Sequence, residues 1–193
     1  MYLCLPDDIM HRTHRYSPAR HLLITINDLE LAAAVLLFAA IRLAVCQNRH
    51  RDCSTWPVVQ LLLDNVTAKK NINKGTARSP AARALLRLLS YIAKGSPVSW
   101  NAEFIPGIDN IEADYLSRHA LDFDICPAKA YSDFFNISPQ SVGYDIYRPS
   151  QELLSAVFCA LRSGSLPGPL VKKIRAPMSV DENTLGTFVS RTL

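Results

Sequence analysis

The sequence predicts an α/β protein in which a mixed sheet is flanked by helices and followed by an irregular, partly helical C-terminal extension. The first observation is Val58–Leu63, a largely apolar run of strand length. The second is the helical pattern on both sides of it, with apolar residues three and four positions apart. The third is the series of six prolines between positions 127 and 177, which break up the later patterns.

Length and composition agree with one compact domain plus an extension, because the 193 residues are 49% hydrophobic. The formal charge of +4 is unevenly distributed. Between Asn65 and Ala102 there are seven basic residues and no acid, whereas Glu103 to Asp124 holds six acids and only Arg118. A basic lobe beside an acidic pocket suits a polyanion held near a divalent cation. A solvated basic helix face explains the same charges.

Cysteine usage and hydropathy favour an intracellular protein, in the cytoplasm or nucleus. The five cysteines are scattered without CxxC spacing, as expected of reduced thiols. The N-terminus lacks a secretory signal pattern. The most apolar stretch, Leu31–Ile41, has 11 residues between Glu30 and Arg42. It is too short to span a bilayer, so no membrane segment is expected.

The N-terminal elements are expected in the following order. Residues 1–20 form an irregular basic lead-in, and residues 21–26 form a short strand with β-branched residues. Asn27 or Asp28 then caps a helix over 29–47, which is apolar on nearly every face.

The middle of the chain is the most regular part. Val58–Leu63 is expected to be a central strand buried on both faces, because apolar residues occur at positions that point to either face. A short helix over 66–73 is stopped by Lys74-Gly75. A second helix has Pro80 at its first position. Its buried face is marked by Leu85, Leu88, Leu89 and Ile92, and Arg83 and Arg87 share another face.

The last elements complete the expected domain. Residues 98–105 are expected to form a strand, followed by a helix that opens with an Asp109–Glu112 capping box. Asn110 and Asp114 share one face of that helix. The division is therefore a lead-in at 1–20, a domain at 21–122 and a Pro-rich linker at 123–193, with one helix near 150–162 and a linker-like Ser163–Pro169.

Three acids lie where separate elements could bring them together. Glu30 is on the first long helix, Asp64 follows the strand Val58–Leu63, and Asp114 is on the last helix of the domain. A carboxylate at a strand end is placed at the rim of the sheet, where α/β proteins bind ligands. The pattern predicts a cation site built from three elements. The alternative is that these acids are helix caps and solvated residues.

The local sequences strengthen the first interpretation. Thr25-Ile-Asn-Asp-Leu-Glu30, Leu63-Asp64-Asn65 and Asn110-Ile-Glu-Ala-Asp114-Tyr-Leu-Ser-Arg118 occur in this order. Together they resemble the ribonuclease H domain of retroelement polyproteins. The residue pattern of these motifs is most similar to the variant that follows reverse transcriptase in DIRS-type and gypsy-type retrotransposons. The resemblance covers about half of the chain, from Arg20 to Arg118.

The resemblance implies hydrolysis of the RNA strand of an RNA–DNA hybrid, with two Mg²⁺ ions about 4 Å apart. Mg²⁺ prefers oxygen ligands, which fits carboxylates. The implied metal ligands and catalytic residues are Glu30, Asp64 and Asp114. The implied substrate-binding residues are Asn65, Lys69, Lys70, Lys74 and Asn110. The implied partners are the hybrid and an upstream reverse transcriptase domain in the parent polyprotein.

Two departures from the family change the expected activity. The family's first strand carries another catalytic Asp, but only 29 residues precede Glu30 here, and Asp7 and Asp8 lie too close to it. Phe104 stands where the family often has a His near the last helix. We therefore expect a truncated ribonuclease H-like domain that lacks its first strands, holds at most one Mg²⁺ weakly and is inactive alone. The alternatives are a non-catalytic nucleic-acid-binding or tethering module, and a generic α/β interaction protein.

Overall fold

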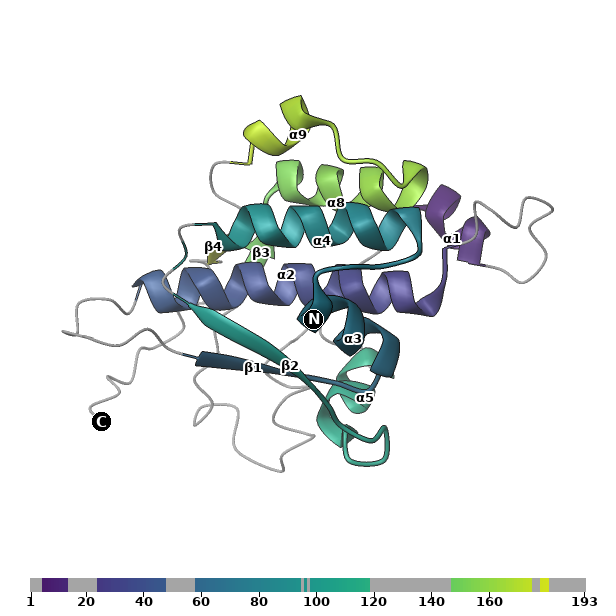
Figure 1. The fold of residues 1–193 in the computed structure, drawn as a ribbon, viewed down its shortest axis with the longest axis vertical. Coiled ribbons are helices and arrows are strands. Elements are labelled where there is room, and N and C mark those ends of the chain that lie inside the picture. Colours follow the sequence, from purple (N-terminus) through teal and green to yellow (C-terminus); the bar gives the residue numbers. More distant parts are fainter. Residues whose placement is uncertain are drawn as a thin grey trace.

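The computed structural model describes residues 5–13, 24–47, 58–94, 96, 98–118, 147–174 and 178–180. Over these ranges the chain is a mixed α/β protein, mostly helical, with a small parallel sheet. Helices α2 (Ile26–Gln47), α4 (Pro80–Ala93) and α8 (Gln151–Ser163) lie side by side in a stack, and the parallel sheet lies on the opposite side of α2 from α4 (Figure 1). Buried residues from all three helices and the sheet form one hydrophobic core.

The segment expected to be an irregular lead-in contains a helix, α1 (Asp7–Thr13). The backbone N–H groups of Ile9 and Met10 both donate to the carbonyl of Pro6, at 2.9 and 3.0 Å. Asp7 and Asp8 occupy the first turn, where negatively charged side chains stabilise a helix by interacting with the positive end of its dipole. The fully buried Ile9 ties this turn to the core. The prediction missed these helix-start signals among the surrounding basic residues.

The expected strand at 21–26 is wrong over its described part, because Ile24 and Thr25 are irregular and Ile26 already begins α2. Residues 21–23 lie outside the described ranges. The Asp28 carboxylate accepts from the backbone N–H of Thr25 at 2.9 Å and from its hydroxyl at 2.8 Å. Thr25 is thus the N-cap residue, and Asp28 completes a capping box with it. This helix-start signal outweighs the preference of the β-branched residues for a strand.

Helix α2 passes through the centre of the molecule, as its apolar surface predicted. Val35, Phe38 and Ala39 are completely buried. The Phe38 ring packs on Trp100 of the sheet with 5.4 Å between ring centroids. Among the described helices, the segment Ile26–Cys46 alone is long and apolar enough to cross a membrane, a property that core helices share.

Strand β1 (Val58–Leu63) forms with the expected boundaries and pairs in parallel with β2 (Ser99–Phe104). The expectation that β1 is buried on both faces is wrong for the described structure. Leu61 and Leu63 are buried, but the side chains of Val58 and Leu62 are 73% and 54% exposed. The reason is that β2 is the one described partner strand and the described helices cover one face of the pair.

Helix α3 (Val66–Lys74) follows β1 and protects the free edge of β2. Asn73 donates to the carbonyl of Ala102 at 2.8 Å and accepts from its backbone N–H at 3.0 Å. One side-chain amide thus replaces a neighbouring strand at a fully buried residue. The helix ends at Gly75, whose φ of 64° is left-handed, as the sequence predicted.

Helix α4 also follows its sequence signals. The Ser79 hydroxyl accepts from the N–H of Ala82 at 3.3 Å, and Pro80 occupies the first turn. All four expected apolar residues are buried, and both expected arginines are exposed. Arg42 on α2 donates to the carbonyl of Ile92 at 2.9 Å, which satisfies the C-terminal end of α4.

The described residues that follow position 146 contribute to the same core. Helix α8 matches the expected 150–162 helix, and its Leu153, Val157 and Ala160 are completely buried. Part of the expected linker at 163–169 begins α9 (Gly168–Lys172). Strands β3 (Tyr147–Pro149) and β4 (Met178–Val180) pair antiparallel. Residues 119–146 and 181–193 lie outside the described ranges.

Candidate functional site

The parallel strands end at one edge, and the candidate site is built there. The backbone N–H of Ile105 donates to the carbonyl of Leu63 at 3.0 Å, so the two strand ends remain side by side. Asp64 follows β1 directly and is exposed. The N-terminal end of α2 and helix α5 (Ile111–Arg118) lie on this side of the sheet (Figure 1). The carboxyl edge of a parallel sheet is where α/β proteins place ligand-binding groups.

Asn65 organises the backbone around this edge. Its side-chain oxygen accepts from the N–H groups of Thr67 at 3.0 Å and Ala68 at 2.9 Å, which caps α3. Its amide donates to the side-chain oxygen of Asn27 at 2.8 Å, linking the strand end to the first turn of α2. Asn65 was predicted to contact substrate, and its observed contacts are structural. Asn27 had been considered only as a helix cap.

Glu30 lies one turn further along α2 and is half-buried. Burial raises the pKa of its carboxyl, and the negative charge of Asp64 raises it further. The second effect means that the charges of the two carboxyl groups interact, although the residues are 34 positions apart in the chain. The Asn27–Asn65 hydrogen bond explains their approach, because it fixes the helix turn that carries Glu30 against the loop that carries Asp64.

Asp114 lies on α5, which begins at the same edge. Its backbone N–H donates to the carbonyl of Asn110 at 3.0 Å, so Asn110 and not Asp109 occupies the N-cap position. The side chain of Asp114 is exposed. In the described part of the chain, no group of three Asp, Glu, His or Cys side chains is close enough to hold a metal ion. The charge of Asp64 thus acts on Glu30, and the described residues do not gather Asp114 with them into one three-carboxylate group.

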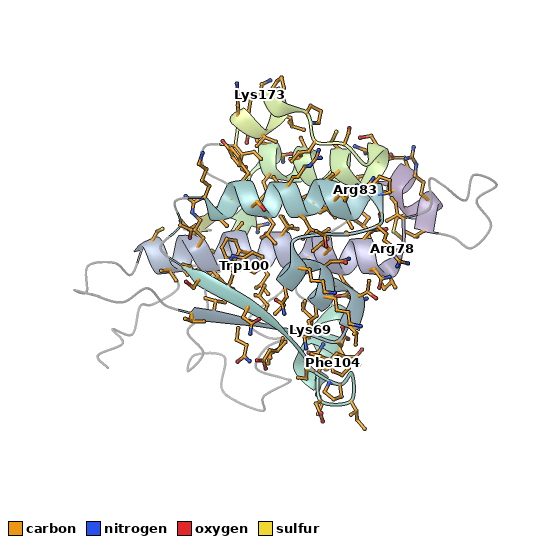
Figure 2. All side chains as sticks on the ribbon, in the orientation of Figure 1. Lys69, Arg78, Arg83, Trp100, Phe104 and Lys173 are labelled. Carbon is orange, nitrogen blue, oxygen red and sulfur yellow. The ribbon has the colours of Figure 1, made fainter. Side chains whose placement is uncertain are left out.

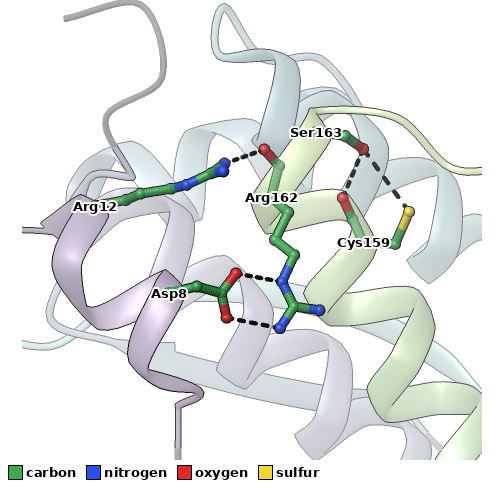
Figure 3. Close-up of polar contacts among 5 residues, drawn as sticks. All are labelled: Asp8, Arg12, Cys159, Arg162 and Ser163. Atoms are coloured by element: carbon green, nitrogen blue, oxygen red, sulfur yellow. Dashed lines mark hydrogen bonds and ion pairs between the residues drawn. The ribbon is translucent and has the colours of Figure 1, made fainter. Parts of the chain in front are cut away.

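Asp8, considered for the missing first-strand Asp, is occupied elsewhere. Its two carboxylate oxygens accept from Nε and Nη2 of Arg162 at 2.5 and 2.8 Å (Figure 3). The hydrogen bond to Arg162 lowers the pKa of Asp8. Arg12 also donates to the backbone carbonyl of Arg162. These contacts join α1 to α8 and do not involve the sheet edge.

The predicted substrate-binding lysines lie on α3. Lys70 and Lys74 are exposed, Lys69 is half-exposed, and none of them has an acidic partner within the described ranges. Figure 2 shows Lys69 on the same side of the molecule as Arg78 and Arg83, with Phe104 below them. The basic surface thus runs from α4 towards the edge where β2 ends.

Comparisons with models of protein families, with curated proteins and with solved structures found no match. The chemistry of the edge therefore follows from its own residues. Two neighbouring carboxylates of which one is half-buried repel each other when both are ionised. They can relieve that repulsion by sharing a proton or by binding a cation. A cation would also attract a phosphate to the same place.

Proposed function

We propose that this chain is a retroelement-derived ribonuclease H-like domain that binds RNA–DNA hybrids and does not cleave them efficiently by itself. The observation that carries the proposal is the neighbouring pair Glu30 and Asp64 at the carboxyl edge of a parallel strand pair. The order of helix, strand and helix carrying the three acids supports it. The fold of the described residues, a helical α/β protein with a small parallel sheet, is compatible with that lineage.

The carboxylate pair fits one hydrated Mg²⁺ better than two ions. Mg²⁺ keeps several waters and is commonly bound by one or two carboxylates together with substrate phosphates. Glu30 and Asp64 would supply the two carboxylates. When bound, the ion would polarise a phosphate oxygen of the RNA strand. Two-metal hydrolysis needs a ligand that bridges both ions, and the resemblance assigns that role to an Asp of the family's first strand.

The basic side of α3 supports the nucleic-acid half of the proposal. Lys69, Lys70 and Lys74 have no described acidic partner, so their charge is available to phosphates. The same observation favours a second candidate, a non-catalytic nucleic-acid-binding or tethering module of a reverse transcriptase polyprotein. The two differ in whether the acidic edge binds metal. In either case we propose an intracellular location and an upstream reverse transcriptase domain as partner.

The proposal is tested with a labelled RNA–DNA hybrid and Mg²⁺, using the wild-type chain and Asp64→Asn. We expect Mg²⁺-dependent hybrid binding by the wild type, weaker Mg²⁺ dependence in the variant and cleavage no faster than the variant's background. Robust turnover that Asp64→Asn abolishes would overturn the claim of inactivity. Binding that ignores Mg²⁺ in both proteins would favour the tethering module, and absence of any hybrid binding would contradict both candidates.

A further inference from the structure

A surface groove lies between the loop that follows α3 and the exposed face of α4. It has a volume of about 510 Å³ and is lined by Gly75, Thr76, Ala77, Arg83, Leu86, Arg87 and Ser90. Leu86 is buried, whereas both arginines are exposed. None of the lining residues is acidic. The groove was not among the sites that the sequence predicted.

The two arginines are arranged to face an anion together. They are four positions apart on α4, so their side chains leave the same face of the helix one turn apart. Nη1 of Arg83 donates to the carbonyl of Arg78 at 2.7 Å, which holds the loop against α4 and orients the guanidinium. Arg87 makes no hydrogen bond or ion pair with any described residue. A guanidinium has five N–H donors, so most of them are available to a ligand.

The loop adds donors on the other side of the groove. Gly75 donates its N–H to the carbonyl of Ile72 at 3.2 Å and turns the chain with a positive φ. The next two N–H groups, of Thr76 and Ala77, have no acceptor among the described residues. Thr76 and Ala77 both line the groove. Successive free N–H groups beside a guanidinium pair suit a phosphate oxygen.

We propose that this groove binds a backbone phosphate of a nucleic acid strand, with Arg83 and Arg87 as the phosphate-binding residues. This inference rests on the nucleic-acid half of the proposed function and is independent of the metal edge. The groove is open, whereas sites for small ligands enclose most of the ligand surface. The positive charge also continues beyond it, because Arg78 and Lys69 follow Arg83 across the same side of the molecule (Figure 2). An extended polyanion uses that whole surface, and a free phosphate uses only the groove.

The test is fluorescence anisotropy with a labelled 20-nucleotide RNA–DNA hybrid from 50 to 300 mM KCl. The test variant is Arg83→Gln with Arg87→Gln. The matched control is Lys172→Gln with Lys173→Gln, which removes the same charge from two exposed residues at the C-terminal end of α9. Since Arg83 also holds the loop, the single variant Arg87→Gln separates phosphate binding from a disturbed loop. Thermal unfolding by circular dichroism checks that each variant is folded.

The inference predicts that the arginine double variant binds the hybrid at least about tenfold more weakly at 0.1 M salt. It also predicts that the slope of log affinity against log salt concentration falls in magnitude by about two. Arg87→Gln has about half of this effect on the slope, and the lysine control changes affinity by less than about twofold. Equal losses of affinity in both double variants would overturn phosphate binding by the groove, although the protein would still bind the hybrid. Wild-type protein that binds no hybrid would overturn the proposed function as well. Displacement of the hybrid by micromolar inorganic phosphate would contradict a strand-binding groove, because a free ion would then be the better ligand.

Discussion

Gly164 ends α8 where that helix meets the start of α4, and its replacement tests how the C-terminal region joins the core. Its φ is +62°, and a methyl group there would lie 2.4 Å from Cβ of Pro80 and 3.2 Å from the Pro80 carbonyl carbon. Gly75 ends α3 with a nearly identical φ of +64°, but no described atom lies within 4 Å of the equivalent position. The two glycines therefore separate the cost of the backbone angle from the cost of the contact.

The expected magnitudes follow from these two environments. Gly75→Ala places an L residue in the left-handed region, which costs about 1–2 kcal/mol. Gly164→Ala has the same cost and also overpacks against a proline ring that has no other rotamer, which adds about 1–3 kcal/mol. We therefore expect Gly164→Ala to lower the free energy of unfolding by about 2–5 kcal/mol. For a chain of this size each kcal/mol lowers Tm by about 2–4 °C.

The assay is urea unfolding followed by circular dichroism, with both alanine variants measured beside the wild type. A double-mutant cycle with Pro80→Gly isolates the contact, because that change removes the Cβ that the new methyl group would meet. In the Pro80→Gly background, Gly164→Ala should cost less than in the wild type but still more than Gly75→Ala, because the backbone carbonyl carbon of residue 80 remains 3.2 Å from the new methyl group. Equal costs for the two alanine variants in the wild-type background would refute the close approach of α8 to α4.

Three further predictions concern the sheet and the acidic edge. Asn73→Ala should lower the free energy of unfolding by about 1–3 kcal/mol, because it leaves two buried backbone groups of Ala102 unpaired. The control Asn71→Ala on the same helix should change that free energy by less than about 0.5 kcal/mol in the same urea assay. The raised pKa of Glu30 means that the native state binds its proton more tightly than the unfolded state, so the penalty is absent below the ordinary value of 4.5 and develops as pH rises above it. Urea titrations from pH 4 to 8 should therefore show Glu30→Gln gaining stability over the wild type with rising pH, and less so in an Asp64→Asn background; a gain that is independent of pH would contradict the shift. Asp8→Asn should leave hybrid binding and Mg²⁺ affinity unchanged, because its carboxylate is held by an arginine on α8, and a loss of Mg²⁺ affinity would show that Asp8 belongs to the acidic edge.

Elements with local start and stop signals were the ones that the sequence predicted well. Helix α4 has Ser79 and Pro80 at its start, and α3 has Asn65 before it and Gly75 after it. The strand expected at 21–26 failed because two local signals compete there. The β-branched run favours a strand, but the Thr25–Asp28 capping box begins a helix.

The assignment of the site residues stays a prediction, and the sequence did not predict the hydrogen bond that positions them. Asp64 at a strand end is a local pattern, whereas the Asn27–Asn65 hydrogen bond joins residues 38 positions apart. No periodicity or motif reports such a contact, because it depends on how α2 crosses the sheet. The exposure of β1 was missed for a similar reason. An apolar strand shows what it could bury, and only the arrangement of its neighbours decides which face is covered.

The central claim is that Glu30 and Asp64 act as one cation-binding pair. Its most direct test is calorimetric titration of Mg²⁺ into the wild type, Glu30→Gln, Asp64→Asn and the control Glu152→Gln, which alters an exposed acid in the first turn of α8. The pair predicts one weak binding event in the wild type and the control, and its loss in both edge variants. Absence of binding in the wild type, or equal binding in all four proteins, would contradict it.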